Sequence, residues 1–178
     1  MNKLNGKVAV VTGAFKSIGA SIVEHLAAEG ASVVVNYANS ITGADHVVDH
    51  IKEKGGKATA VQGDVGRSED IQHLFAETKK AYNKGDILVN NAGVYEFAPL
   101  EAITVEHIEK HLNLNVVGLL LTTQAAVKLI GPDGGSVIIS PWPDRSAGRY
   151  RFAATFLASD DSRWITGQVI VAAGGRRM

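Results

Sequence analysis

The chain has 178 residues, of which 46% are hydrophobic and 20% are charged, and its 18 basic and 18 acidic side chains cancel to zero net charge. This composition fits one globular domain, excludes a largely disordered chain, and leaves no basic surplus for a general nucleic-acid binder. Cysteine is absent, which excludes disulfides, thiolate metal sites and a cysteine nucleophile. The first apolar run is too short for a signal peptide or a membrane span, so we expect a soluble, cytoplasmic protein without a membrane partner.

Short apolar strands alternate with amphipathic helices along the first two thirds of the chain. The expected strands are Lys7–Thr12, Ser32–Tyr37, Ala58–Gln62, Asp86–Asn90, Ser136–Ser140 and Gln168–Ala172. The helices expected between them are Ser17–Glu29, Thr42–Lys54 and Ser68–Tyr82, followed by glycines 30, 55–56 and 85, which we expect to take positive φ. This alternation predicts a parallel sheet buried on both faces.

The second half of the chain is less regular. Thr104 to Ile130 is longer than an ordinary helix and predicts two helices that join near Asn113 to Gly118. The prolines within residues 141–146 exclude a helix there, and a short helix is expected at Gly148–Ala158. We therefore expect a single domain over residues 1–178, with an irregular junction at about residues 141–151.

The strongest chemical signal is the segment from Thr12 to Gly19, between the first strand and the first helix. Glycines in such a turn let backbone N–H groups and the helix N-terminus face an anionic pyrophosphate, and Gly19 permits close packing of the helix on the strand. An ordinary tight turn is the alternative. The position of the turn within a βαβ unit favours dinucleotide binding.

At these residues the chain resembles the short-chain dehydrogenase/reductase family, especially members similar to 3-oxoacyl-carrier-protein reductases and glucose dehydrogenases. The family pattern Thr-Gly-x-x-x-Gly-x-Gly is matched by Thr12, Gly13 and Gly19, with Ser17 in place of the middle glycine. Asn90-Asn91-Ala92-Gly93 matches a second pattern in full, and Asn115-Val116 with Gly118 matches a third. The resemblance implies a Rossmann-like, doubly wound parallel sheet in three α/β/α layers, which lacks one βα unit and the substrate lobe.

The resemblance also implies the site residues. The expected cofactor-binding residues are Gly13, Phe15, Lys16, Ser17, Ile18, Gly19, Asn36, Tyr37, Asp64, Val65, Asn91, Ala92 and Gly93. Asn115 and Ser140 are the expected catalytic residues, Asn115 holding a water in a proton relay and Ser140 orienting the substrate oxygen. For Ser140, an ordinary serine at the end of a strand is the alternative. The second strand ends without a carboxylate that would bind the ribose hydroxyls of NAD(H), and Lys16 offers a positive charge, so we expect NADP(H) to be preferred.

The family reaction is hydride transfer between nicotinamide and a carbonyl or alcohol substrate, with a Tyr-x-x-x-Lys pair transferring the proton. None of the four tyrosines has a lysine four residues later; the residues at that position are Ile41, Asp86, Pro99 and Ala154. The family pattern breaks off after Ser140 and resumes at about Phe152. The chain is either an internally deleted member or an incomplete record of a longer enzyme. If the deletion is real, Gln168–Ala172 could pair directly beside Ser136–Ser140.

Three functions remain open: an NADP(H)-dependent carbonyl reductase whose Tyr-Lys pair lies outside this sequence, a non-catalytic dinucleotide-binding remnant, and a product that binds nothing well because Phe15 and Ser17 crowd the turn. Two helical pairs, His46/His50 and His107/His111, have a spacing that can bind a metal, but we interpret them as solvated helix faces and expect no metal site. Family members are commonly tetramers. Loss of part of that interface would expose an apolar stripe around Leu119–Ile130, so we expect a homo-oligomer.

Overall fold

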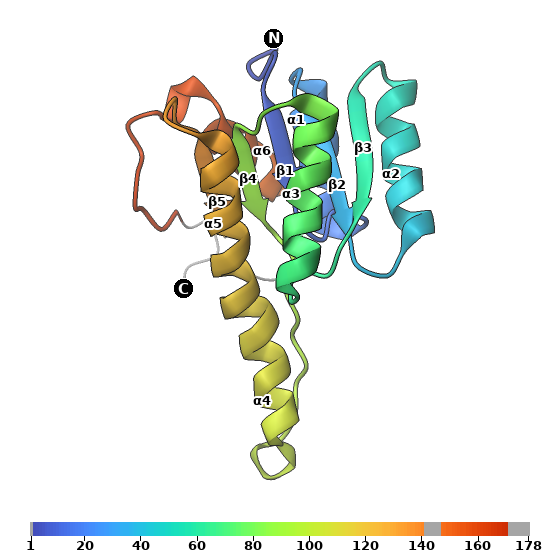
Figure 1. The fold of residues 1–178 in the computed structure, drawn as a ribbon, viewed down its shortest axis with the longest axis vertical. Helices are drawn as coiled ribbons and strands as arrows, with labels where there is room; N and C mark the ends of the chain where they lie inside the picture. Colours follow the sequence, from blue (N-terminus) through green and yellow to red (C-terminus); the bar gives the residue numbers. More distant parts are fainter. Residues whose placement is uncertain (1, 141–146, 171–178) are drawn as a thin grey trace.

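Five parallel strands form the centre of the molecule (Figure 1). The computed structural model describes residues 2–140 and 147–170. The strands lie in the order β3-β2-β1-β4-β5. β2 and β3 are added on one side of β1, and β4 and β5 are added on its other side, so the strand order reverses between β1 and β4. Ligands of such sheets bind beyond the carboxyl ends of the strands at this reversal. The strands are β1 (Val8–Val11), β2 (Ser32–Tyr37), β3 (Lys57–Gln62), β4 (Ile87–Asn90) and β5 (Ser136–Ile139).

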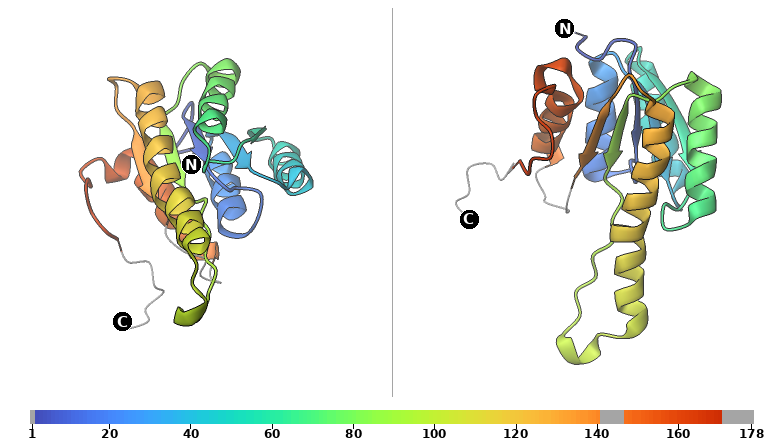
Figure 2. Two further views of the ribbon diagram at one scale, coloured as in Figure 1. Left: turned by 60° about the horizontal axis from the view of Figure 1, so that its bottom comes forward. Right: turned by 60° about the vertical axis from the view of Figure 1, so that its left-hand side comes forward.

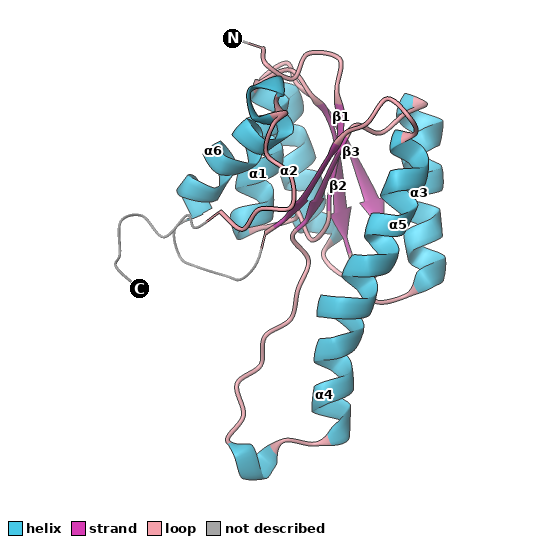
Figure 3. Ribbon diagram, turned by 90° about the vertical axis from the view of Figure 1, so that its left-hand side faces the viewer, coloured by secondary structure: helices cyan, strands magenta, loops and turns pink. Residues whose placement is uncertain are grey.

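Helices cover both faces of the sheet. Figure 2 and Figure 3 show α1, α2 and α6 on one face and α3 and α5 on the other. The expected three-layer α/β/α arrangement is therefore confirmed. The bounds of these helices are α1 (Ser17–Ala28), α2 (Ile41–Glu53), α3 (Ser68–Tyr82), α5 (Leu119–Ile130) and α6 (Ala147–Ala158).

Burial on both faces explains the continuous apolar strands. Successive side chains of a strand point to opposite faces, and in β1 Val10 belongs to the core under α3 and α5, whereas Ala9 and Val11 belong to the core under α1, α2 and α6. Val34 in β2 and Leu88 in β4 belong, like Val10, to the core under α3 and α5. Since neither face meets water, these strands carry no alternating polar residues.

A long helical arm extends beyond the sheet. It consists of α4 (Val105–Leu112), a π-helical turn at Asn113–Gly118, and α5, and α4 projects past the carboxyl ends of the strands (Figures 1 and 3). A 3-10 turn at Leu100–Ala102 precedes it. The predicted join between two helices is confirmed and is the π turn. By length and composition the whole span Val105–Ile130 could cross a membrane, a test that core helices of soluble proteins also pass.

The expectations for residues 168–170, Gly56 and Gly85 are wrong. Residues 168–170 carry no strand and pair with no part of β5, because the sheet ends at β5; residues 171–172 lie outside the described part. The suggested pairing of this segment beside Ser136–Ser140 therefore does not occur for residues 168–170. Gly85 also does not take positive φ: Asn83, with φ +60°, ends α3, and its amide donates to the Lys79 carbonyl. Gly30 and Gly55 do take positive φ, as expected, whereas Gly56 does not.

Candidate functional site: an anion-binding turn at the carboxyl ends of the strands

The turn from Thr12 to Gly19 joins β1 to α1 and requires glycine at two positions. Gly13 has φ +62°, and a Cβ there would lie 3.0 Å from the Cα atom of Ala92. A Cβ on Gly19 would lie 2.6 Å from Asn91 Nδ2 and 2.7 Å from the Gly13 carbonyl oxygen. The distances at Gly19 are too short for a real Cβ, and at Gly13 the contact would be tight and the positive φ would strain a side chain, so the two glycines allow α1 and the segment after β4 to close on the turn.

Five consecutive backbone N–H groups of this turn make no hydrogen bond to the described part of the chain. Within residues 2–140 and 147–170, the amides of residues 15–19 have no hydrogen-bond partner, whereas those of Gly13 and Ala14 are bonded to Asn36. These five groups stand at the N-terminus of the 12-residue helix α1. A helix N-terminus with free amides attracts a phosphate group, and the turn therefore fits the pyrophosphate of a dinucleotide.

Phe15, Lys16 and Ser17 stand where the turn departs from the family pattern. Ser17 has φ +50°, the left-handed region in which the family has glycine, and its side chain is exposed. Lys16 is also exposed, and its Nζ atom lies 5.1 Å from the centre of the Phe15 ring. The Phe15 ring is half-buried against the core under α1 and α2 rather than fully exposed.

Asn36 and Tyr37, at the carboxyl end of β2, are buried. Asn36 is 2% exposed, and its side chain bonds to Gly13, Val61 and Gly63 of the protein. The Tyr37 ring lies in the core, and its carbonyl accepts a hydrogen bond from the Gly63 amide. The exposed or half-exposed end of the segment is the stretch 38–40, which leads into α2, where Ser40 Oγ accepts from the Gly43 amide.

Asn91 fixes the turn from the side of β4. Its Nδ2 atom donates to the carbonyls of Thr12 (2.9 Å) and Gly13 (3.1 Å). In return, Thr12 Oγ1 accepts from the amides of Asn91 (3.0 Å) and Ala92 (2.9 Å). The carboxyl ends of β1 and β4 are thus joined by four hydrogen bonds at the point where the strand order reverses. Gly93 follows, and a Cβ there would lie 3.2 Å from Asn115 Oδ1.

Asp64 and Val65 lie in the loop that follows β3. Asp64 Oδ1 accepts from the Gly66 amide at 2.9 Å, so the carboxylate stabilises its own loop. Val65 is buried, and a Cβ on Gly118 would lie 2.4 Å from the Val65 carbonyl oxygen. Glycine at position 118 therefore lets the helical arm approach this loop closely.

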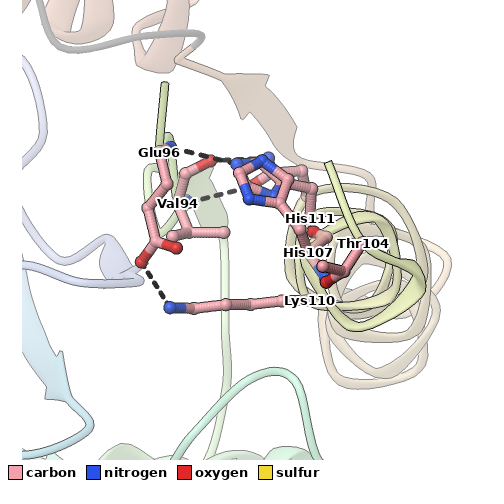
Figure 4. Close-up of polar contacts among 7 residues, drawn as sticks. Val94, Glu96, Thr104, His107, Lys110 and His111 are labelled. Atoms are coloured by element: carbon pink, nitrogen blue, oxygen red, sulfur yellow. Dashed lines mark hydrogen bonds and ion pairs between the residues drawn. The ribbon is translucent and has the colours of Figure 1, made fainter. Parts of the chain in front are cut away.

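Asn115 lies in the π turn and holds the segment that follows Gly93. Its side chain accepts from the Val94 amide (2.9 Å) and donates to the Val94 carbonyl (2.8 Å). One turn earlier, His111 Nε2 accepts from the Glu96 amide (3.0 Å) while Nδ1 contacts the His107 carbonyl (2.7 Å) (Figure 4). The side chains of the arm thus bind the backbone of residues 94–96 much as a neighbouring strand would.

The interpretation of His107 and His111 as a solvated face is wrong. Their rings stack with centroids 4.5 Å apart, both are half-buried, and His111 is engaged at both nitrogens. The four-residue spacing of His107, His111 and Asn115 was the available signal, because it places them on one helix face. No cluster of metal-ligating side chains occurs among the residues that the structure describes.

Glu96 and Lys110 form an ion pair beside these histidines (Figure 4). The hydrogen bond from Lys110 lowers the pKa of the Glu96 carboxyl below its ordinary value, and the charge of Lys110 and the two histidines act in the same direction. Glu96 is therefore a carboxylate at neutral pH. The pair ties the extended segment to α4 a second time.

Ser140 directly follows β5. Its amide donates to the Asn90 carbonyl at 3.0 Å, which continues the register of β4 and β5 by one residue. Ser140 therefore stands at the same edge of the sheet as the turn, Asn91 and Asn115. Residues 141–146, where the expected junction begins, lie outside the described part.

Comparison with known proteins identifies the chain's relatives. A family model for short chain dehydrogenases matches residues 7–140. An uncharacterized oxidoreductase of Methylorubrum extorquens is 38% identical over 253 aligned residues, which cover 99% of this chain and 100% of the relative. Because this chain has only 178 residues, that alignment must leave at least 75 positions of the relative, the difference between 253 and 178, without a counterpart.

Solved structures show the same fold. The reductase LugOII, described as promiscuous and as catalysing keto-reduction at C1 during lugdunomycin biosynthesis, is 31% identical with a TM-score of 0.89, over 98% of each chain. A short chain dehydrogenase from Burkholderia cenocepacia in complex with NADP is 33% identical with a TM-score of 0.73, over 85% of this chain and 64% of that one. Against several curated reductases, this chain spans about half of their length.

Proposed function

Because the chain belongs to the short chain dehydrogenase family, we propose that it binds NADP(H) for an oxidoreductase that transfers hydride between nicotinamide and a carbonyl or alcohol substrate. The observation that carries this proposal is the row of five free amides at the N-terminus of α1, framed by Gly13 and Gly19. When bound, the nicotinamide ring supplies or accepts the hydride. The relatives are oxidoreductases by name, and one related structure is a complex with NADP.

In this proposal different segments of the chain bind different parts of the cofactor. The amides of residues 15–19 bind the pyrophosphate, and the loop of Asp64 and Val65 borders the adenine. The segment after Asn91 leads past Gly93 toward the nicotinamide and the substrate, where Asn115 and Ser140 stand. Asn115 keeps that segment in place through Val94, and Ser140 orients a substrate oxygen.

The preference for NADP(H) rests on charge. An added 2′-phosphate on the adenosine ribose requires a site without a carboxylate, and the stretch 36–40, at the end of β2 and just beyond it, has none. Lys16 is exposed in the turn and offers a cation, and α2 begins at Ile41 with its N-terminus at the same edge. Both features favour a doubly charged phosphate over a free ribose hydroxyl.

Cofactor titration tests the preference. We expect the unmodified chain to bind NADPH more tightly than NADH, and Lys16→Gln to weaken NADPH binding by about three- to ten-fold with little change for NADH, since one partly screened charge pair is lost. The control is Lys52→Gln, a lysine in the last turn of α2. Equal affinity for the two cofactors, or tighter NADH binding, contradicts the preference.

A second candidate function is that of a dinucleotide-binding chain without catalysis. The absence of a Tyr-x-x-x-Lys pair anywhere in the sequence favours it, because the proton transfer then lacks its usual donor. An NADPH-oxidation assay on a simple ketone separates the two candidates, provided that an intact mass near 18.8 kDa identifies the chain. Turnover supports the first candidate; binding without turnover supports the second.

Localisation and assembly are also proposals. Members of the family are mostly soluble, and we propose a cytoplasmic protein whose small-molecule partner is the carbonyl or alcohol substrate. Neither nucleic acid nor membrane is a partner in this proposal. The zero net charge argues against nucleic-acid binding, because it leaves no basic surplus for phosphates.

A further inference from the structure

Asn36 has an unusual environment for a polar residue at the carboxyl end of a strand. It is 2% exposed, and its amide group is surrounded by backbone polar atoms from two other segments. Oδ1 accepts from the Gly13 amide at 3.2 Å, and Nδ2 donates to the carbonyls of Gly63 (2.9 Å) and Val61 (3.3 Å). Only this orientation of the side chain pairs donors with acceptors, because a flipped amide would set its oxygen against two carbonyls.

The backbone of Asn36 adds a further bond to the same turn. Its carbonyl accepts from the Ala14 amide at 2.8 Å. Asn36 therefore engages two consecutive amides, Gly13 through its side chain and Ala14 through its main chain, and anchors both to β3. Asn91 holds the Thr12 and Gly13 carbonyls from the side of β4. The beginning of the turn is thus fixed from both neighbouring strands.

This arrangement decides which amides can meet a ligand. The N–H groups of Gly13 and Ala14 are occupied by Asn36, and the next five, of residues 15–19, are left free. If Asn36 were lost, the Gly13 amide would have no acceptor, and the turn could rotate about the flexible Gly13. The free amides would then no longer be held in one orientation before the anion arrives.

We propose that Asn36 is a positioning residue for the pyrophosphate of the dinucleotide, which it never touches: it fixes Gly13 and Ala14 so that the amides of residues 15–19 converge on one anion. This role rests on the proposed function. It differs from the direct cofactor contact that the sequence suggests, because the side chain is buried and each of its hydrogen bonds goes to the protein.

The test compares three variants by thermal unfolding and by the dissociation constant of NADPH. Asn36→Ala removes all side-chain bonds, and Asn36→Asp keeps the acceptor for Gly13 but sets an oxygen against the Val61 and Gly63 carbonyls. Thr78→Val is the matched control, since Thr78 is fully buried in α3 and donates to the Leu74 carbonyl at 2.8 Å, away from the turn. A second probe, adenosine 2′-monophosphate, lacks the pyrophosphate.

We expect both Asn36 variants to weaken NADPH binding by about ten-fold or more, the effect of leaving one buried polar group unpaired and the turn unfixed. Adenosine 2′-monophosphate should bind the Asn36→Ala chain within about two-fold of the unmodified chain, whereas Asn36→Asp adds a carboxylate near the expected 2′-phosphate and should weaken binding of both probes. Thr78→Val should lower the melting temperature and leave NADPH binding unchanged. NADPH binding unchanged in a folded Asn36 variant, or an equal loss for both probes in Asn36→Ala, would overturn the inference.

Amide hydrogen exchange on the unmodified chain tests the same point without a variant that must fold. The amides of Gly13 and Ala14 should be protected before any ligand is added, and those of residues 15–19 only after NADPH is added. A Gly13 amide that exchanges freely without ligand contradicts the role of Asn36. If the unmodified chain binds no NADPH, the proposed function fails instead, so the two failures are distinguishable.

Discussion

At the scale of single residues, Ser17 is under backbone strain. Its φ of +50° lies in the left-handed region, which costs a residue with a Cβ on the order of 1 kcal/mol. Its side chain is exposed and makes no hydrogen bond within the described residues, so nothing local offsets this cost. Ser17 stands at the first position of α1, where the amides of the anion site are also placed.

We therefore expect Ser17→Gly to stabilise the chain by about 0.5–1 kcal/mol, since the relief of strain exceeds the added entropy of the unfolded glycine. Urea unfolding at 25 °C measures the change. Ser21→Gly is the control in the regular part of α1, and should destabilise by about 0.5 kcal/mol through lower helix propensity. A Ser17→Gly chain that is less stable than the original contradicts the strain.

The sequence predicted where the turn lies better than it predicted what each residue near the turn contacts. The pattern from Thr12 to Gly19 indicates the turn, and the distances at Gly13 and Gly19 give the reason for glycine there. The proposed role of Asn36 could not be predicted from the sequence, because its acceptors Val61 and Gly63 lie in β3 and directly after it, far away along the chain. A strand-end asparagine looks the same in a sequence whether it faces a ligand or a neighbouring backbone.

At the scale of elements, α6 packs on α1 through a titratable contact. The His25 ring of α1 meets the Phe152 ring of α6 edge-on at 4.9 Å between centroids. Burial, and secondarily the charge of Arg151, lowers the pKa of His25 below its ordinary value of 6.5. The unfolded chain thus binds a proton more readily than the folded chain, and the contribution to stability is present above pH 6.5 and is lost as the pH falls through the folded-state pKa.

We expect the melting temperature to fall between pH 7.5 and pH 5, and His25→Gln to reduce that fall because glutamine does not titrate. His73→Gln on the exposed face of α3 is the control and should leave the pH dependence unchanged. Circular dichroism at both pH values measures it. A His25→Gln chain with the full pH dependence rules out this contact as its source.

Helices and strands were predicted closely where local patterns decide them. Ser32–Tyr37 and Ser68–Tyr82 match β2 and α3 at both ends, because turn residues and charged first and last turns mark their limits. The strand expected at Gln168–Ala172 fails for residues 168–170, although the run is apolar, because a strand also requires a neighbour to pair with. Apolar sequence cannot show whether that neighbour exists.

At the scale of the whole molecule, the sheet ends at an open strand. Val137 and Ile139 of β5 are 40% and 54% exposed, and Leu120 and Val127 of α5 are similarly uncovered. Part of the stripe expected on α5 is covered after all: Leu121, Ala125 and Leu129 pack against the core beside α3. The remaining exposed apolar surface is what a missing βα unit would leave.

We therefore propose that the 178-residue chain self-associates through this surface. Light scattering should report a mass above that of the monomer, which rises with concentration. Leu120→Glu, which places a charge on the exposed face of α5, should shift the chain toward monomer, and Ile41→Glu, at an exposed site of α2, should not. A monodisperse monomer at all concentrations contradicts self-association.

The fold class could be predicted from the sequence because alternating strands and helices permit few topologies. The length of 178 residues did not by itself show that a part present in relatives is missing. The alignment with the Methylorubrum oxidoreductase reaches both ends of that protein but leaves at least 75 of its 253 aligned positions unmatched by the 178 residues. We propose that the unmatched positions hold the Tyr-Lys unit. In this proposal the chain keeps the turn from Thr12 to Gly19 and lacks the proton-transfer pair.

The most direct test is calorimetric titration of NADPH into the intact 178-residue chain, alongside a Gly19→Val variant. We expect saturable binding of one NADPH per chain, which is abolished in Gly19→Val because a side chain there would overlap Asn91 and the Gly13 carbonyl. No binding by the unmodified chain, or equal binding by the variant, would contradict the assignment of the turn from Thr12 to Gly19 as the dinucleotide site.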